Sequence, residues 1–79
     1  MNNLSNIYIK NREELAENLR FLREQSGLSQ QQVAKKLFMD RSTYAYYESA
    51  KVEPNIFTLI RLAEIYNVSF NVFISAKGP

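Results

Sequence analysis

Cysteine and histidine are both absent from the 79 residues, and glycine and proline occur only twice each. Without cysteine the chain forms no disulfide, and without either residue it lacks the usual ligands of zinc, iron and copper. The same absence excludes nucleophilic sites in which a histidine activates a cysteine or serine. No glycine-rich phosphate loop and no constellation of catalytic carboxylates is recognisable, so we expect no enzymatic activity, no metal and no cofactor.

Long apolar runs are also missing. The first residues, MNNLSNIYIKNREE, lack the basic start and apolar stretch of an export signal. No apolar run approaches the roughly 18 residues that a membrane-spanning helix needs. These features predict a soluble protein of the cytoplasm, although the absence of cysteine is compatible with any compartment.

The charge balance is only slightly basic. The net charge is +2 with a sequence pI of about 9.0, and 46% of the residues are hydrophobic and 23% charged. This composition is typical of one small globular domain with a single core. A net charge this small does not by itself indicate an anionic partner. Whether such a partner is expected depends on how the charges are distributed along the chain.

Capping residues divide the chain into helices. Five residues have side chains suited to the N-cap of a helix: Asn11, Ser29, Asp40, Asn55 and Ser69. Glu14 and Gln32 stand three residues after the first two and complete capping boxes. Gly27 and Asn67 are suited to the left-handed backbone that ends a helix. Apolar spacing between these signals is helical, and no strand is predicted in the core.

The expected fold is a compact all-α domain of five helices. The helices are predicted at 12–25, 30–37, 41–49, from 56 to the turn at Asn67, and in a short segment from residue 70. The domain spans residues 11–75, after an arm or short strand at 1–10 and before a tail at 76–79. Because the predicted helices 30–37 and 41–49 are short and joined by a tight turn, we expect them to form a helix-turn-helix, whose second helix can lie in the major groove of DNA.

An ordered series of landmarks identifies a family. They are Arg20, Arg23, Gly27-Leu28-Ser29-Gln30, Val33-Ala34, Leu37, Arg41-Ser42-Thr43, Tyr47-Glu48, Pro54, Leu59, Ala63 and Val68-Ser69. The run that contains them, residues 19–74, closely resembles the Cro/cI-type, or lambda-repressor-like, helix-turn-helix domain of phage repressors and bacterial regulators of the XRE family. The resemblance covers about 70% of the chain, and a chance match of the whole series is improbable.

The resemblance implies a DNA-reading surface on helix 41–49. The residues expected to contact base edges are Arg41, Ser42, Ala45 and Tyr46, and those expected to contact phosphates are Gln30, Thr43 and Lys51. Arg41 has the strongest chemistry, because a guanidinium group can bond bidentately to guanine O6 and N7. For Arg41, Thr43, Lys51 and Tyr46 the alternative is an ordinary exposed surface position.

The resemblance further implies a structural ion pair between Arg23 and Glu48, which ties helix 41–49 to the first helix. Helical spacing predicts that Tyr44, Tyr46 and Tyr47 do not all lie on the same face of helix 41–49. Tyr44 and Tyr47 share the face that we expect to pack in the core, whereas Tyr46 points outward.

Two residues depart from the family pattern. Ala50 stands where glycine is usual, and Phe38 stands where glycine or asparagine is frequent, because the backbone at both positions tends to positive φ. If the backbone is retained, each residue carries strain of about 1 kcal/mol or more. The alternative is that both turns are remodelled.

The sequence therefore predicts a sequence-specific DNA-binding transcriptional regulator, most simply a repressor. The family implies a homodimer on double-stranded DNA with a near-palindromic operator. Candidate contacts between subunits are Phe70, Phe73 and Ile74, the arm at residues 7–9, and Phe21. For Phe73 the alternative is packing in the core. The alternative is a protein-interaction module of the same fold, such as an antitoxin or adaptor, with little salt-dependent DNA binding.

Overall fold

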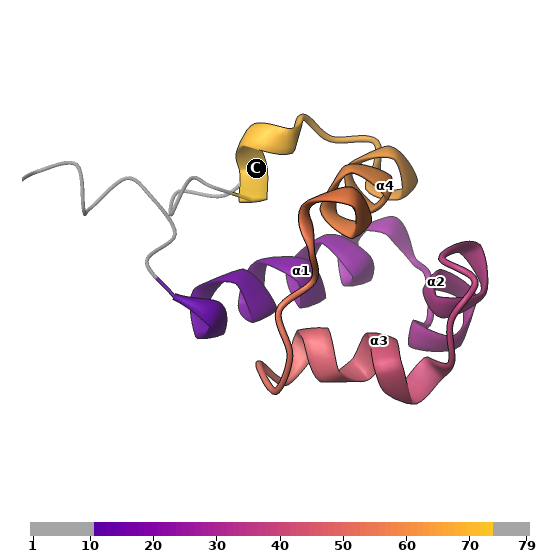
Figure 1. Ribbon diagram of the computed structural model, residues 1–79. Helices are drawn as coiled ribbons and strands as arrows, with labels where there is room; N and C mark the ends of the chain where they lie inside the picture. Colours follow the sequence, from indigo (N-terminus) through magenta and orange to yellow (C-terminus); the bar gives the residue numbers. More distant parts are fainter. Residues whose placement is uncertain (1–10, 74–79) are drawn as a thin grey trace, which may run out of the picture.

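The computed structural model describes residues 11–73, and within them it contains four α-helices and one 3-10 turn. The elements are α1 (Arg12–Ser26), α2 (Gln30–Lys36), α3 (Arg41–Glu48), α4 (Ile56–Tyr66) and the 3-10 turn η2 (Phe70–Phe73). The expected arm, Ile74 and the tail lie outside the described residues. In Figure 1, α1 lies between α3 on one side and α4 with η2 on the other. The all-α prediction is confirmed, but the segment expected to be a fifth helix is a single 3-10 turn.

Local side-chain bonds begin α1 and α2 where the sequence predicted. The Asn11 side chain accepts a hydrogen bond from the Glu14 amide at 3.0 Å. Ser29 and Gln32 make both bonds of a capping box, at 3.1 and 2.8 Å. Asp40 occupies the N-cap position of α3 as expected, but its side chain makes no capping bond. The start of α3 therefore depends more on its packing than on its own cap.

Within residues 11–73, four residues adopt left-handed backbone, and two of them are unsuited to it. Gly27 and Asn67 end α1 and α4 with φ of 75° and 56°, as predicted. Phe38 and Ala50 have φ of 59° and 66°, so the turns on either side of α3 keep the family's backbone and are not remodelled. Because the Cβ of an L residue crowds the carbonyl in this region, each costs about 1 to 2 kcal/mol.

One apolar core fills the space between the helices. Its buried members are Leu19, Leu22, Val33, Ala34, Leu37, Tyr44, Tyr47, Leu62, Ala63, Tyr66, Val72 and Phe73. Tyr44 and Tyr47 meet edge to face with ring centroids 6.0 Å apart, and the Tyr44 hydroxyl lies 2.6 Å from that of Tyr66. The prediction that Tyr44 and Tyr47 are core residues is confirmed.

Phe73 also belongs to this core, so the structure supports the core alternative for this residue and not a contact between subunits. It packs edge to face on the half-buried Phe70, with ring centroids 6.0 Å apart. The burial of Phe73 and Val72 in the core attaches η2 to its own domain. None of the helices within residues 11–73 has the length and apolar character needed to cross a membrane.

Candidate functional site

A buried ion pair joins α1 to the last residue of α3. Arg23 Nε lies 2.7 Å from Glu48 Oε2, and Arg23 Nη2 lies 3.1 Å from Glu48 Oε1. The Glu48 side chain is only 3% exposed. Burial alone raises the pKa of Glu48, but hydrogen bonds from Arg23, Tyr44 and Gln30 outweigh it and hold that pKa below its ordinary value of 4.5. Glu48 is therefore a carboxylate at neutral pH.

Arg23 also fixes the connection between α1 and α2. Its Nη1 donates to the carbonyl oxygen of Leu28 at 3.1 Å, so one guanidinium group touches α1, the turn before α2 and the end of α3. Such a pair orients these elements more than it stabilises them, because removing the two charges from water offsets much of their attraction.

Gln30, the first residue of α2, links Glu48 to Arg41. Its Nε2 donates to Glu48 Oε1 at 3.0 Å, and its Oε1 accepts from Arg41 Nη1 at 3.1 Å. A chain of hydrogen bonds thus runs from the half-buried Arg23 through the buried Glu48 to the exposed start of α3. The second Nε2 hydrogen of Gln30 is available for a further acceptor.

The outward edge of α3 presents the residues predicted to contact bases. Arg41, Ser42 and Tyr46 are exposed and Ala45 is half-buried, while Thr43 is exposed at the margin of this edge. The four base-contact candidates fall within about 140° of the helix circumference, because they occupy its first, second, fifth and sixth positions. Tyr44, Tyr47 and Glu48 occupy the inward side.

Lys51, predicted to contact a phosphate, lies beside Tyr46. Its Nζ is 5.4 Å from the centroid of the Tyr46 ring, within the range of a cation–π interaction. Its backbone is held as well, because Arg12 Nη1 at the start of α1 donates to the Lys51 carbonyl at 3.1 Å. Both ends of the exposed edge of α3 therefore carry a cation in a restrained position.

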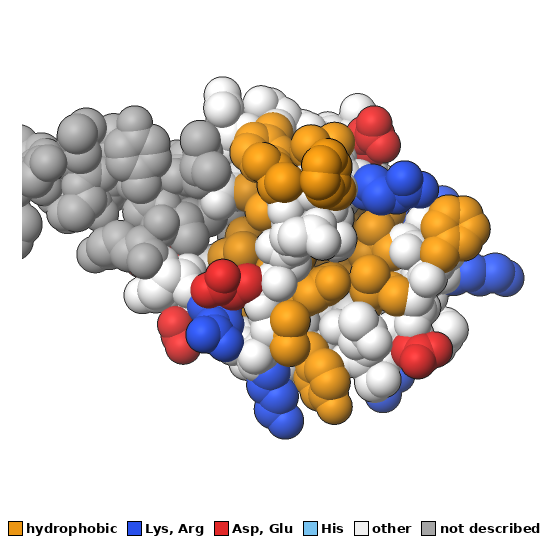
Figure 2. Space-filling view, in the orientation of Figure 1, with side chains coloured by type: hydrophobic (Ala, Val, Ile, Leu, Met, Phe, Trp, Pro, Cys, Tyr) orange, Lys and Arg blue, Asp and Glu red, His pale blue; other side chains and the backbone are white. Residues whose placement is uncertain are grey.

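A shallow groove of about 380 Å³ borders this edge. Its lining residues are Arg20, Arg23, Gln30, Ala45, Tyr46, Glu48, Ser49 and Lys51. Figure 2 shows Lys and Arg side chains along the lower edge of the molecule, where Figure 1 places α3. No role was predicted for Arg20 or Ser49. The position of Arg20 one turn before Arg23, on a helix bonded to the end of α3, is the signal that could have found it.

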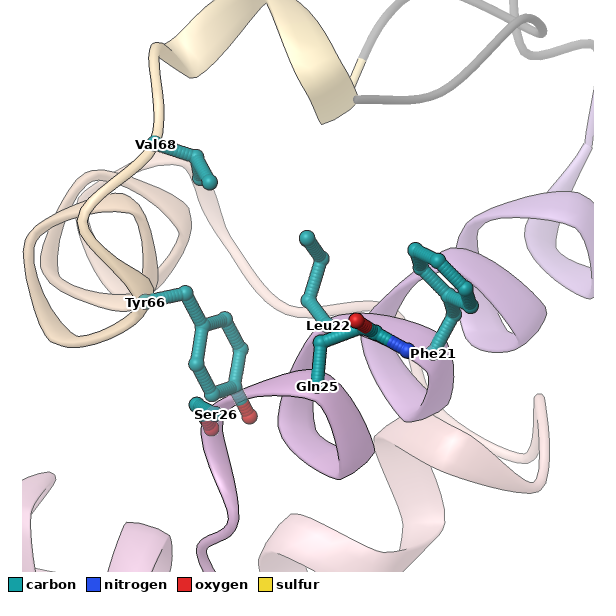
Figure 3. Close-up of a pocket in the computed structure, with 6 residues that line it drawn as sticks. All are labelled: Phe21, Leu22, Gln25, Ser26, Tyr66 and Val68. Carbon is teal, nitrogen blue, oxygen red and sulfur yellow. The ribbon is translucent and has the colours of Figure 1, made fainter.

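A second pocket, of about 320 Å³, opens between α1 and the end of α4 (Figure 3). It is lined by Phe21, Leu22, Gln25, Ser26, Tyr66 and Val68. Burial raises the pKa of Tyr66 to about 12, so its hydroxyl is neutral and bonded to Tyr44. None of the predicted base or phosphate contacts lines this pocket, and its side chains offer no charged group to a ligand.

Several known proteins resemble this chain in sequence and in fold. Residues 19–73 match the family model HTH_3, described as Helix-turn-helix. The uncharacterized HTH-type transcriptional regulator YqaE of Bacillus subtilis (strain 168) is 37% identical over 63 residues, which are 80% of this chain and 54% of that protein. A transcriptional regulator from Listeria innocua is 38% identical with a TM-score of 0.69, over 76% of this chain and 56% of that one. The BldD DNA-binding domain of S. venezulae is 26% identical with a TM-score of 0.69, over 80% of this chain and 94% of that one. The chain spans about half the length of the first two relatives.

Proposed function

Because the chain belongs to the helix-turn-helix family, we propose that it is a transcriptional regulator that binds double-stranded DNA with α3 in the major groove. The observation that carries this proposal is the exposed edge of α3, whose first residue, Arg41, is held by Gln30. The names of the relatives, two transcriptional regulators and one DNA-binding domain, support it.

Base reading is proposed for Arg41, Ser42, Ala45 and Tyr46. Arg41 spends one of its five N–H donors on Gln30 and keeps the others for a bidentate contact with guanine, worth roughly 1 to 3 kcal/mol of discrimination. Ser42 can donate or accept and so discriminates weakly. Ala45 and the ring of Tyr46 offer apolar surface to a thymine methyl group.

Phosphate binding is proposed for Gln30, Thr43 and Lys51, and the groove adds Arg20 to this set. Such contacts set the register of α3 on the duplex without reading sequence. Gln30 is suited to a double role, because one of its amide hydrogens bonds Glu48 and the other is available to a phosphate oxygen.

The local charge supports a polyanionic partner. Four basic residues lie between positions 28 and 51, namely Lys35, Lys36, Arg41 and Lys51, against two acids, Asp40 and Glu48. Glu48 is buried and neutralised by Arg23 from outside this segment. The segment is therefore more basic toward DNA than the net charge of the whole chain indicates.

We further propose that two copies bind a near-palindromic operator and repress transcription by occupying it. In a two-fold dimer on such a site, the two α3 helices enter successive major grooves about 34 Å apart. The predicted alternative, an antitoxin or adaptor that uses the fold to hold another protein, requires no such spacing.

Titration of random and selected duplexes at several salt concentrations tests the function. DNA binding through phosphates gives a steep linear fall of log affinity with log salt concentration. Arg41→Ala should remove the preference at one base pair, and Arg41→Lys should also remove it while keeping the charge, because an ammonium group lacks the bidentate fork. Lys51→Ala should weaken binding to all sequences alike and lower the salt slope by about 1. Lack of binding at low salt would leave only the protein-interaction alternative.

A further inference from the structure

Two tyrosine hydroxyl groups are buried in the core and bonded to each other. Tyr44 of α3 is fully buried, Tyr66 of α4 is 7% exposed, and their oxygens lie 2.6 Å apart. Within residues 11–73 this is the only hydrogen bond between α3 and α4, and Figure 1 shows α1 between these two helices. A buried hydroxyl group needs a hydrogen-bond partner, whereas a phenylalanine ring of nearly the same shape does not. Packing alone therefore does not account for the two hydroxyls.

The Tyr44 hydroxyl connects this pair to Glu48. It donates to the Glu48 carboxylate, which accepts only, because it is ionised. Since the Tyr44 proton lies toward Glu48, Tyr66 is the donor and Tyr44 the acceptor in the bond between the hydroxyls. The hydrogen bonds therefore run in one direction, from α4 through α3 to the buried carboxylate.

The Glu48 carboxylate fixes the amide of Gln30 in the same way. The Gln30 NH2 group faces Glu48, so its oxygen faces Arg41. Glu48 accepts two bonds from Arg23, one from Gln30 and one from Tyr44, and a carboxylate offers about four acceptor sites. Each donor thus limits where the other donors can lie, and the place of Arg41 depends on all four bonds.

We propose that Tyr44 and Tyr66 are positioning residues for the DNA-reading surface. By donating from the core side, the hydroxyl pair keeps the Glu48 carboxylate where Gln30 can hold Arg41. Neither tyrosine touches DNA, and the effect on base preference rests on the proposed function. Hydrogen bonds in a chain polarise one another, so loss of the Tyr66 hydroxyl alters the bonds at Gln30 even in the free protein.

Nitrogen-15 NMR of the full chain without DNA tests the positioning. Tyr66→Phe should shift the side-chain amide signals of Gln30 and the Nε–H signal of Arg23, because both groups donate to Glu48. Tyr47→Phe is the matched control, since it removes a hydroxyl from the same buried face of α3, outside the network described for residues 11–73. If Tyr66→Phe moves these signals no more than Tyr47→Phe does, the proposal is refuted.

DNA titrations measure the consequence for base reading. The readout is the ratio of affinities for two duplexes that differ only at the base pair where Arg41→Ala loses its preference. Tyr44→Phe and Tyr66→Phe should each lower this ratio by about threefold or more, and Tyr47→Phe should leave it unchanged. Loss of folded protein weakens binding to both duplexes equally, so a purely structural role does not change the ratio. An unchanged ratio in both single variants would overturn the proposal.

The double variant Tyr44→Phe/Tyr66→Phe separates positioning from stability. It removes both partners of the hydroxyl pair and keeps both rings, so little stability should be lost. Circular dichroism should show a folded domain whose ratio of affinities is nevertheless reduced. In an Arg41→Ala background the two substitutions should have no further effect on the ratio. A further fall would contradict the route through Arg41.

The two proposals fail in different experiments. If the wild type binds no DNA at low salt, the proposed function fails, while the NMR comparison still decides whether the tyrosines position Gln30. If the wild type reads base sequence and the Tyr44 and Tyr66 variants read it equally well, the proposed function stands and the positioning role is wrong.

Discussion

We expect Glu48→Ala to cost the domain a large part of its stability. Glu48 accepts two hydrogen bonds from Arg23 and one from Gln30 while almost fully buried. Removing one partner of a buried ion pair costs about 3 to 5 kcal/mol, because the other charge is left without compensation. A domain of 79 residues has a free energy of unfolding of roughly 4 to 12 kcal/mol. The melting temperature should therefore fall by roughly 15 to 30 °C.

Urea denaturation followed by circular dichroism at neutral pH measures this loss. Glu48→Gln keeps the shape and one acceptor for Arg23, so its destabilisation should lie between those of wild type and Glu48→Ala. Glu17→Ala removes an exposed carboxylate from α1 and should change the free energy by less than about 0.5 kcal/mol. If Glu48→Ala unfolds within about 1 kcal/mol of the wild type, the ion pair does not hold α3 in place.

At acidic pH the wild type and Glu48→Gln should have the same free energy of unfolding. The pKa of Glu48 is lower in the folded protein than its ordinary value of 4.5, so its stabilising contribution is complete above that value and is lost as the pH falls through the folded pKa. The difference in free energy between the two proteins should shrink below a pH of about 4.5. A difference that stays constant in acid would show that the charge is not its source.

Three further outcomes follow from the same structure. Ala50→Gly should raise the free energy of unfolding by about 0.5 to 1 kcal/mol in urea titrations, because relief of the left-handed strain exceeds the entropy that glycine adds to the unfolded chain. The free energy of unfolding should decline as the pH rises above about 10, because burial raises the pKa values of both Tyr44 and Tyr66, the latter to about 12. A pH titration of Tyr66→Phe should show a smaller decline. A double-mutant cycle of Arg41→Ala and Gln30→Ala should give a coupling of at least about 0.5 kcal/mol in base preference; additive effects would show that Gln30 does not position Arg41.

Local signals predicted the helices well. Asn11 and Ser29 cap their helices through bonds to residues only three positions later, and Gly27 ends α1 through its own backbone. Such bonds depend on sequence neighbours alone. The segment after Ser69 was predicted less well, because a few residues of helical spacing fit an α-helix and a 3-10 turn equally. Its packing on the rest of the core decides between them.

Contacts between distant residues limited the prediction of the site. The outward position of Tyr46 follows from helical spacing, and the structure shows it exposed. The bonds of Gln30 to Arg41 and Glu48 join residues 11 and 18 positions apart, and no local pattern specifies them. The same holds for α4, where apolar spacing predicted a wide buried face but could not show which part of it the domain covers.

Because of the chain of hydrogen bonds through Gln30, a substitution of Arg41 should disturb the structure more than a substitution of Ser42 or Tyr46. Arg41 is bonded to groups that end in the buried carboxylate of Glu48, so a substitution there alters a network that also orients the helix. Ser42 has no such link in the structure described for residues 11–73, and the Tyr46 ring lies beside the Lys51 ammonium group, outside this network of hydrogen bonds. On the proposed base-reading surface, new operator preferences should therefore be selected most readily from libraries randomised at Ser42 and Tyr46, with Arg41 left unchanged.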